Sequence, residues 1–378
     1  MMIELVFTGL CVGLTSAVAN INAEALATRK KVKVFILAGQ SNMEGHGQIR
    51  SLDHLGNHPQ YGHLLKKLKA PDGSWAVSSS VFVSWQTYGQ PRRHAPLSVG
   101  QGATENSVGP ELMFGTIMDE KYDAPILLIK TAWGGKDVYC DFRSPGAGGP
   151  DGGAARRLEK ERSEGQEREV GTYYRLMVSE IFNTLDKIRE VVPGYQEQGY
   201  ELAGLAWFQG WNDFCQWPEF PGIVSDYPRH LSAMIHDLRQ DLNVPEMPFV
   251  IGELGIGGEE IVEKARGENN HEAQAIVHFR QGQRAVAKEY GLEKVTFVPT
   301  ADFWDSRLQE LRQISDRWWH EKRKQRLPDS EENHLPTKEL NDEYYLQRVN
   351  HWYCHYNGSA SNYCLIGYAL AQALINEE

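Results

Sequence analysis

The chain has 378 residues, of which 41% are hydrophobic and 10% aromatic, so it can fill a sizeable core. Its formal net charge of −11 argues against a nucleic-acid partner, because phosphate binding relies on clustered lysine and arginine. Length alone allows two domains, but α/β enzymes often use this much chain as one domain with long loops.

The first twenty residues are largely apolar and end in the small-residue sequence AVA at 17–19. This pattern predicts a signal peptide over 1–19, a linker over 20–31 and a secreted or periplasmic protein. A membrane anchor or a misassigned start codon is the alternative, because Glu4 stands where a signal normally carries a positive charge. No other apolar run reaches the roughly 20 residues that cross a bilayer, so we expect no stable membrane insertion after cleavage.

Four cysteines follow the leader, namely Cys140, Cys215, Cys354 and Cys364. An even number in an exported protein permits two disulfides, with three possible pairings. None of the spacings is that of a zinc ribbon. We therefore expect no structural metal, and we identify no other cofactor.

Five short apolar runs are predicted to be strands, because each is followed by polar or glycine residues and then by a helical pattern. They are 32–38, 126–130, 204–208, 248–252 and 295–299. Strands that alternate with helices predict a parallel sheet covered on both faces. The expected fold class is therefore α/β, a three-layer α/β/α sandwich around a mainly parallel five-stranded sheet.

Apolar residues recur at helical spacing over 177–188, 231–242 and 366–374, and the last of these helices should close the sheet. Three long irregular insertions are expected between the elements. They lie at about 48–109, 144–171 and 305–350. Loops of this length are usually functional or disordered. We expect the aromatic-bearing insertions to wall a site and the glycine-rich 144–171 to be mobile.

The segment VFILAGQSN at 34–42 is a buried-strand pattern that ends at Gly39. Ligands bind beyond the carboxyl ends of parallel strands, which places Ser41 where chemistry would be done. A serine at a tight strand-to-helix turn can expose its hydroxyl while its own N–H points at the same spot. Ser41 is therefore a candidate nucleophile; the alternative is a helix N-cap in an ordinary loop.

Two further strands end in groups that could stabilise a negative charge. Gly134 and Gly135 follow the second strand, where a free backbone N–H could donate to an oxyanion or the pair could simply mark a turn. After the third strand, Gln209 or Asn212 could supply an amide donor. Asp213 in the same stretch could act as a carboxylate in the site or cap a helix.

A histidine precedes the last predicted helix, at position 355. His355 could take the proton from Ser41 and return it to a leaving alcohol. His351 is its only near rival, and a histidine among aromatic residues is also commonly structural.

These pieces, in this order, resemble the SGNH hydrolases, in the branch of the sialate O-acetylesterase-like domain and carbohydrate esterase family 6. The residues that carry the likeness are GQSNM at 39–43, AWGG at 132–135, WFQG at 207–210, and His355 with Gly367 behind it. The likeness spans roughly 32–377, with the three insertions poorly covered. It implies a flavodoxin-like fold and a serine esterase that needs no metal.

The resemblance also implies roles for individual positions. Ser41 matches the family nucleophile, and its backbone N–H matches one oxyanion donor. Gly134 resembles the second-block glycine, and Gln209 resembles the third-block amide, although Asn212 could fill that role. His355 matches the catalytic base.

Two positions depart from the family pattern, and both concern the acid that orients the histidine. Trp352 stands where the family often has aspartate, and Trp211 stands where some members have glutamate. Asp213 is the nearest remaining carboxylate, with Asp302 and Asp305 behind it. The site could instead be a Ser-His dyad helped by a backbone carbonyl, and loss of the acid in a triad can cost several powers of ten in turnover.

The sequence thus predicts a secreted esterase that removes acetyl groups from a carbohydrate. Trp85 and Trp211 could stack on sugar rings and Arg92 could hold an anionic group, against the ordinary alternatives of a buried tryptophan and a solvated arginine. Two rival hypotheses are a sugar-binding protein that has lost turnover and a lipid-ester hydrolase. Against the lipid-ester hydrolase, the chain has no obvious leucine-rich lid. A fold alone does not determine which substrate an enzyme takes.

Overall fold

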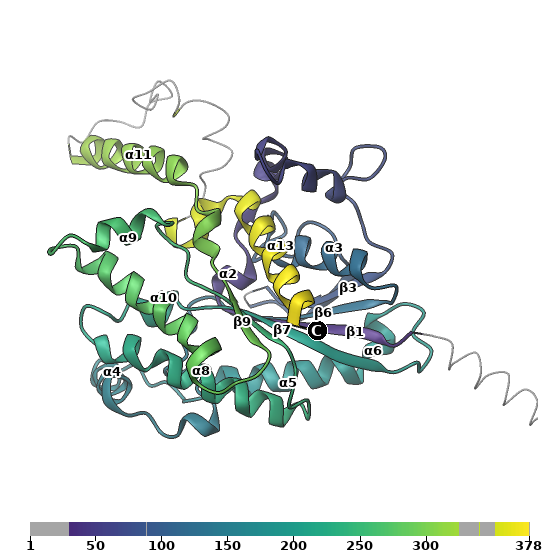
Figure 1. The fold of residues 1–378 in the computed structure, drawn as a ribbon, viewed down its shortest axis with the longest axis horizontal. Helices are drawn as coiled ribbons and strands as arrows, with labels where there is room; N and C mark the ends of the chain where they lie inside the picture. Colours follow the sequence, from purple (N-terminus) through teal and green to yellow (C-terminus); the bar gives the residue numbers. More distant parts are fainter. Residues whose placement is uncertain (1–29, 88, 325–339, 341–351, 378) are drawn as a thin grey trace, which may run out of the picture.

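The structure, a computed structural model, describes residues 30–87, 89–324, 340 and 352–377. Within these ranges the central sheet contains β1 (Val32–Gly39), β3 (Val81–Trp85), β4 (Arg93–Pro96), β6 (Ile126–Ala132), β7 (Tyr200–Phe208), β8 (Phe249–Gly252) and β9 (Val295–Val298). The strand order is β4-β3-β6-β1-β7-β8-β9, with only the β3/β4 pair antiparallel (Figure 1). A short separate pair joins β2 (Gly47–Gln48) to β5 (Ser107–Val108). Strand β1 therefore lies in the middle of the sheet.

Helices cover both faces of this sheet, which confirms the three-layer α/β/α class (Figure 1). One face carries α5 (Thr172–Asp186), α8 (Pro221–Asp241) and α10 (His271–Glu289), and the other carries α3 (Glu111–Lys121) and α13 (Ala360–Glu377). The other α-helices are α2 (Ser41–Glu44), α4 (Gly152–Ser163), α6 (Ile188–Val191), α7 (Trp211–Phe214), α9 (Glu260–Ala265) and α11 (Ser306–Lys324). Short 3-10 helices are η1 (Ile49–Asn57), η2 (Gly62–Leu68), η3 (Pro145–Ala147), η4 (Thr300–Phe303) and η6 (Tyr353–Gly358).

The five predicted strands are confirmed as β1, β6, β7, β8 and β9, but the predicted number of strands is wrong. Strands β3 and β4 come from 48–109, which we expected to be irregular. The segment VFVSW of β3 is rich in β-branched and aromatic residues and is buried along its whole length beside β6. The other two insertions are also partly regular, because they contain α4 and α11. The remainder of 305–350, apart from residue 340, lies outside the described residues.

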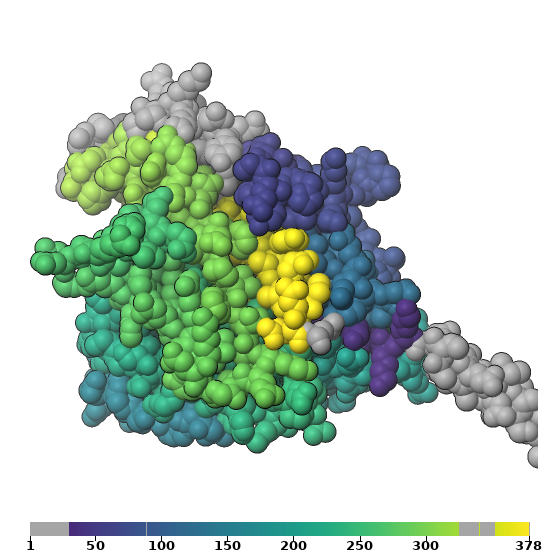
Figure 2. Space-filling view, in the orientation of Figure 1, coloured from purple at the N-terminus to yellow at the C-terminus, as the bar shows by residue number. Residues whose placement is uncertain are grey.

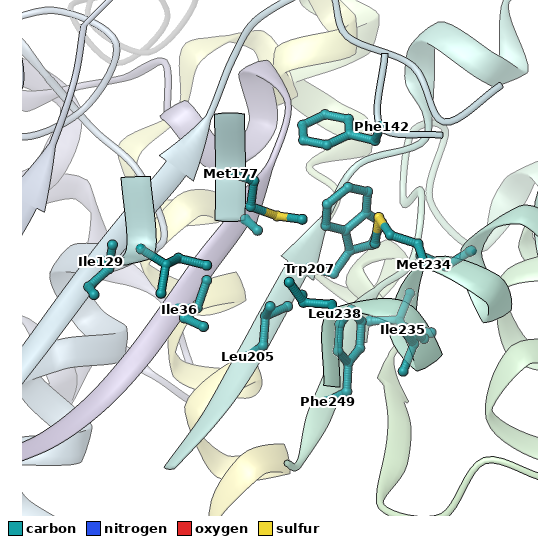
Figure 3. Close-up of a cluster of buried hydrophobic side chains, with 14 of the residues drawn as sticks. Ile36, Ile129, Phe142, Met177, Leu205, Trp207, Met234, Ile235, Leu238 and Phe249 are labelled. Atoms are coloured by element: carbon teal, nitrogen blue, oxygen red, sulfur yellow. The ribbon is translucent and has the colours of Figure 1, made fainter. Parts of the chain in front are cut away.

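The side chains of β1 alternate between two cores, as an unbroken apolar run in a central parallel strand should. Val34 and Ile36 face α5 and α8, whereas Phe35 and Leu37 face α3 and α13. Figure 3 shows the first core, in which Ile36, Ile129, Leu205, Trp207 and Phe249 of the strands pack with Phe142, Met177, Met234, Ile235 and Leu238. Both faces of the strand that leads to Ser41 are therefore fixed by close packing.

The predicted closing helix is α13, whose exposed side forms a yellow strip beside η1 and η2 (Figure 2). Ile366 and Leu370 are fully buried on its inner side. Gly367 lets α13 approach α3 closely, because a Cβ there would lie 2.1 Å from the carbonyl oxygen of Pro110.

The four cysteines after the leader are free thiols, so the two disulfides that their even number permits are not formed. Cys215 is exposed, and the other three are buried. No helix within the described ranges is long and apolar enough to cross a membrane. The predicted signal peptide and most of the predicted linker fall outside those ranges.

Buried Arg143 organises the glycine-rich part of 144–171, which we expected to be mobile. Its guanidinium donates to the carbonyl oxygens of Ala147, Gly148 and Gly149 at 3.1, 2.8 and 2.8 Å. It also donates to Nε2 of His230 at 3.1 Å. Because arginine can only donate, this nitrogen is the unprotonated acceptor. Burial and then the positive charge of Arg143 lower the pKa of His230 to about 3.

We expect this histidine to make the free energy of unfolding fall between about pH 6.5 and pH 3, because the unfolded chain takes up a proton that the folded chain refuses. At about 1.4 kcal/mol for each pKa unit, the loss at pH 4 is about 3 kcal/mol. Urea unfolding of wild type and His230→Gln, which keeps an acceptor but cannot titrate, should show a flatter pH dependence in the variant. The same slope in both proteins would contradict the assignment.

Candidate active site

Gly39 sets the turn that presents Ser41 at the end of β1. Its φ is +151°, and a Cβ there would lie 2.3 Å from the carbonyl oxygen of Phe208, so only glycine fits between β1 and β7. The chain then enters α2 directly at Ser41, whose exposed fraction is 6%. The hydroxyl is therefore held at the carboxyl edge of the central strand.

The structure brings Ser41 and His355 together although they are 314 residues apart. Nε2 of His355 lies 2.8 Å from Oγ of Ser41. Nδ2 of Asn42 donates to the carbonyl oxygen of Cys354 at 3.1 Å, and the Tyr363 hydroxyl donates to Oδ1 of Asn42 at 3.0 Å. These bonds tie the η6 turn to both α2 and α13, so the Ser-His geometry is preorganised.

Two aromatic rings lie parallel to the imidazole of His355. The His46 ring stacks on it at a centroid distance of 4.2 Å and an interplanar angle of 10°. The Trp352 ring lies at 6.2 Å and 15°. Trp352 occupies the position where the family often has aspartate, so a ring plane stands there in place of a carboxylate. We infer that the stacked rings help to set the orientation of His355.

Buried Gln40 connects the ends of β1 and β7. Its Oε1 accepts from the N–H groups of Gly210 at 3.1 Å and Asn212 at 3.3 Å, and its Nε2 donates to Oδ1 of Asn212 at 2.9 Å. The amide oxygen of Asn212 is thereby fixed toward Gln40. Nδ2 of Asn212 donates one of its two hydrogens to the Gly135 carbonyl oxygen at 2.7 Å. The other hydrogen of this NH₂ group is available to a ligand beside the glycine turn.

Gln209 does not fit the donor role that the resemblance implied. It is 3% exposed, and its Nε2 donates to the carbonyl oxygen of Lys136 at 3.1 Å and to Oδ2 of Asp213 at 2.6 Å. Its Oε1 accepts from the Tyr227 hydroxyl at 2.9 Å. Because both amide hydrogens are used inside the protein, Gln209 as oxyanion donor is wrong, and the alternative, Asn212, fits better.

Asp213 is likewise wrong as the acid that orients His355. Its carboxylate accepts from the N–H groups of Val138, at 3.0 Å to each oxygen, and Tyr139, at 3.1 Å. Burial and then the charge of Asp137 raise the pKa of Asp213, and these donors oppose the shift. Asp213 therefore anchors the loop that follows the glycine turn, and it acts on the site through that loop.

The other two candidate acids lie at the η4–α11 junction. Oδ1 of Asp305 accepts from the N–H of Leu308 at 2.8 Å near the start of α11, and Asp302 is exposed. A Ser-His dyad helped by a backbone carbonyl stays a prediction. Within the described ranges, no group of three or more His, Cys, Asp or Glu residues could hold a metal ion.

Glu44 is a site residue that the sequence reasoning missed. A Cβ on Gly134 would lie 2.9 Å from Oε2 of Glu44 and 3.7 Å from Cβ of Ser41, so the three residues meet at one point. Burial raises the pKa of Glu44, opposed by the Gly134 N–H and by the charge of Lys130. The signal was its spacing, because a residue three positions after Ser41 lies on the same side of the first helical turn.

We expect Gly134→Ala to lower kcat/KM on a small acetyl ester by about 10- to 100-fold, somewhat less than the 10²–10³ that follows complete loss of an oxyanion donor. The physical reason is that the new Cβ displaces the Glu44 carboxylate beside Ser41. Gly149→Ala is the matched control, since a Cβ there would meet nothing within 4 Å. Equal activity in the two variants would show that Gly134 does not border the reacting group.

The predicted substrate contacts divide into two groups. Trp85 lies on β3 in the core and is only 6% exposed. Arg92 donates to the Glu180 carboxylate and to the carbonyl oxygen of Ser84. Neither side chain can hold a substrate, so both predictions are wrong. Trp211 is partly exposed next to Asn212, and its ring meets that of Tyr353 edge-on at 5.3 Å. Only Trp211 remains a candidate for contact with a sugar.

Comparisons with known proteins identify a family for the chain. Residues 31–287 match the family model for carbohydrate esterase, sialic acid-specific acetylesterase, a range that includes Ser41, Gly134 and Asn212 and ends before His355. A probable carbohydrate esterase of Arabidopsis thaliana is 24% identical over 230 residues, which is 60% of this chain and 70% of that protein.

Two solved structures are also similar to the chain. A protein from Arabidopsis thaliana has a TM-score of 0.45 at 19% identity and covers 92% of this chain and 99% of its own. A carbohydrate acetylesterase from Xanthomonas citri has a TM-score of 0.38 at 14% identity and covers 70% of this chain and 49% of its own.

Proposed function

The chain belongs to the sialic acid-specific acetylesterase family of carbohydrate esterases, and on that premise we propose that it is a secreted, serine-dependent esterase that removes acetyl groups from a carbohydrate. The observation that carries the proposal is the 2.8 Å contact between Oγ of Ser41 and Nε2 of His355. A serine hydroxyl becomes an effective nucleophile when an adjacent base takes its proton.

In the first step, Oγ of Ser41 attacks the acetyl carbonyl as Nε2 of His355 takes the hydroxyl proton. The resulting oxyanion accepts hydrogen bonds from the backbone N–H of Ser41 and from Nδ2 of Asn212. The Gly134 N–H bonds the Glu44 carboxyl in this structure, and it becomes a third donor when it turns from that carboxyl to the oxyanion. His355 then gives its proton to the sugar oxygen, the C–O bond breaks, and the sugar alcohol leaves an acetyl-serine.

In the second step, His355 takes a proton from water, which attacks the acetyl-serine and releases acetate. The same donors stabilise the second oxyanion, and the proton returns to Oγ of Ser41. The Glu44 carboxyl borders this position, so its protonated form suits the build-up of negative charge better than its ionised form. The raised pKa of Glu44 favours that protonated form.

The test is hydrolysis of p-nitrophenyl acetate, butyrate and octanoate by the purified chain, together with mass mapping of the residue labelled by a phosphonofluoridate. We expect activity highest on the acetate ester and a label on Ser41. A folded protein that neither releases p-nitrophenol nor takes the label would exclude the esterase and favour the sugar-binding alternative. A rate that rises with acyl length would favour the lipid-ester alternative.

A further inference from the structure

A cavity of about 260 Å³ lies beside the His355 turn. Residues of α9, α10 and α11 line it, and so does Tyr353 of η6, two residues before His355. The Tyr353 ring also contacts Trp211, the residue before Asn212, at 5.3 Å. A chain molecule that is bound at Ser41 and passes Trp211 and Tyr353 would therefore enter this cavity, which we call the α9–α11 pocket.

The polar lining of the α9–α11 pocket suits a polyhydroxylated ligand. Amide side chains of Asn270, Gln309 and Gln313 border it, and each amide offers both donors and an acceptor. Oε1 of Gln309 is buried without a hydrogen-bond partner among the described residues. Buried polar atoms are normally paired, so this amide has unused bonding capacity next to the cavity.

Aromatic rings supply the apolar part of the same lining. Trp304 and Tyr353 both border the cavity, and Trp304 is held from behind by the Tyr356 ring at 5.6 Å. A sugar ring has one apolar C–H face and a rim of hydroxyl groups. The aromatic rings of the lining can pack on the C–H face, and the amide side chains can bond to the hydroxyl groups. The volume lies just below the range of about 300–1,000 Å³ for drug-sized ligands, which fits a small unit such as one sugar residue.

The charged groups of the lining decide which kind of sugar it takes. Three carboxylates, Glu260, Glu272 and Glu310, border the pocket. Glu260 lies 3.8 Å from Nζ of Lys264 and Glu310 lies 2.8 Å from the guanidinium of Arg307, so the acidic groups outnumber the basic ones by one. Like charges brought together at an interface are strongly unfavourable, so a sugar that carries a carboxylate is repelled. The sequence-predicted holder of an anionic group, Arg92, is already engaged with Glu180.

We propose that the α9–α11 pocket is a subsite for an uncharged sugar residue of the acetylated glycan, so that the substrate is a neutral oligosaccharide or polysaccharide rather than a sialylated or uronic one. The inference rests on the proposed esterase function, because the pocket is given a role only through its neighbourhood to Ser41 and His355. The inference adds to that function the class of the substrate, a neutral glycan, and the direction in which the glycan extends from Ser41, toward the α9–α11 pocket.

Binding can be measured without turnover by titrating Ser41→Ala calorimetrically with xylotriose and with sialyllactose. We expect heat of binding with xylotriose only. Gln309→Ala in the same background should weaken xylotriose by about five- to tenfold, the value of one neutral hydrogen bond. Gln240→Ala, an exposed glutamine on α8, is the matched control and should bind as the parent does.

Reversing the charge of the lining tests whether its carboxylates exclude an anionic sugar. Glu272 and Glu310 are exposed, so the double variant Glu272→Lys, Glu310→Lys should fold and should bind sialyllactose better than the parent by about tenfold or more. Tighter binding of sialyllactose than xylotriose by the parent, or an unchanged xylotriose affinity in Gln309→Ala, would overturn the subsite. Absence of p-nitrophenyl acetate hydrolysis in wild type would instead overturn the esterase function, so the two failures are distinguishable.

Discussion

Replacing Ser41 by alanine is expected to lower kcat on an acetyl ester by at least about 10⁴-fold, and replacing His355 by alanine should cost about the same. Oγ of Ser41 and Nε2 of His355 are 2.8 Å apart, so the two groups act as one proton-transfer unit. Removal of either group disables the unit. The double variant should therefore be no slower than the worse single variant, because residues that act together are not additive.

Steady-state hydrolysis of p-nitrophenyl acetate, corrected for the spontaneous reaction, measures this effect. Ser225→Ala and His236→Ala are matched controls, since both residues are exposed on α8. Urea unfolding of all variants separates lost chemistry from lost folding. A Ser41→Ala protein that keeps a tenth of the wild-type rate would show that the nucleophile lies elsewhere, and independent multiplicative losses in the double variant would show that His355 does not act on Ser41.

The elements that carry the site could be predicted because each has a local signature. β1 is an unbroken apolar run ended by glycine, and that pattern predicted a strand buried on both faces with Ser41 beyond its carboxyl end. His355 followed from its place before an amphipathic final helix. β3 was missed because a five-residue strand inside a long polar segment is too short for periodicity to separate it from a loop.

The wrong assignments share one cause, which is that residue type does not show where a side chain points. Asn212 and Asp213 are neighbours on the short helix α7, yet Asn212 turns toward Gly135 and Asp213 turns under the loop at Val138. The sequence around Arg92 likewise indicates an exposed arginine, but its guanidinium donates to the carbonyl oxygen of Ser84 on β3 and to the carboxylate of Glu180 on α5. Only tertiary contacts decide such directions.

The choice between Asn212 and Gln209 gives the second large effect. We expect Asn212→Ala to lower kcat by about 10²–10³-fold, the usual result of removing one oxyanion donor. The reason is that Nδ2 of Asn212 is oriented by Gln40 and Gly135 and keeps one hydrogen for the reacting oxygen. The midpoint of urea unfolding should change little, because Asn212 is only partly buried on a four-residue helix.

Gln209→Ala is the contrasting variant, and it should act on stability first. It leaves Asp213 without its 2.6 Å partner and removes the acceptor of the Tyr227 hydroxyl, so we expect unfolding to become easier by about 1–3 kcal/mol. In the protein that remains folded, kcat should fall far less than in Asn212→Ala. Because the two residues are three positions apart on the same strand-to-helix turn, this pair of variants separates a loss of chemistry from a loss of stability at one place in the fold. The opposite pattern, with Gln209→Ala folded but inactive and Asn212→Ala active, would return the donor role to Gln209.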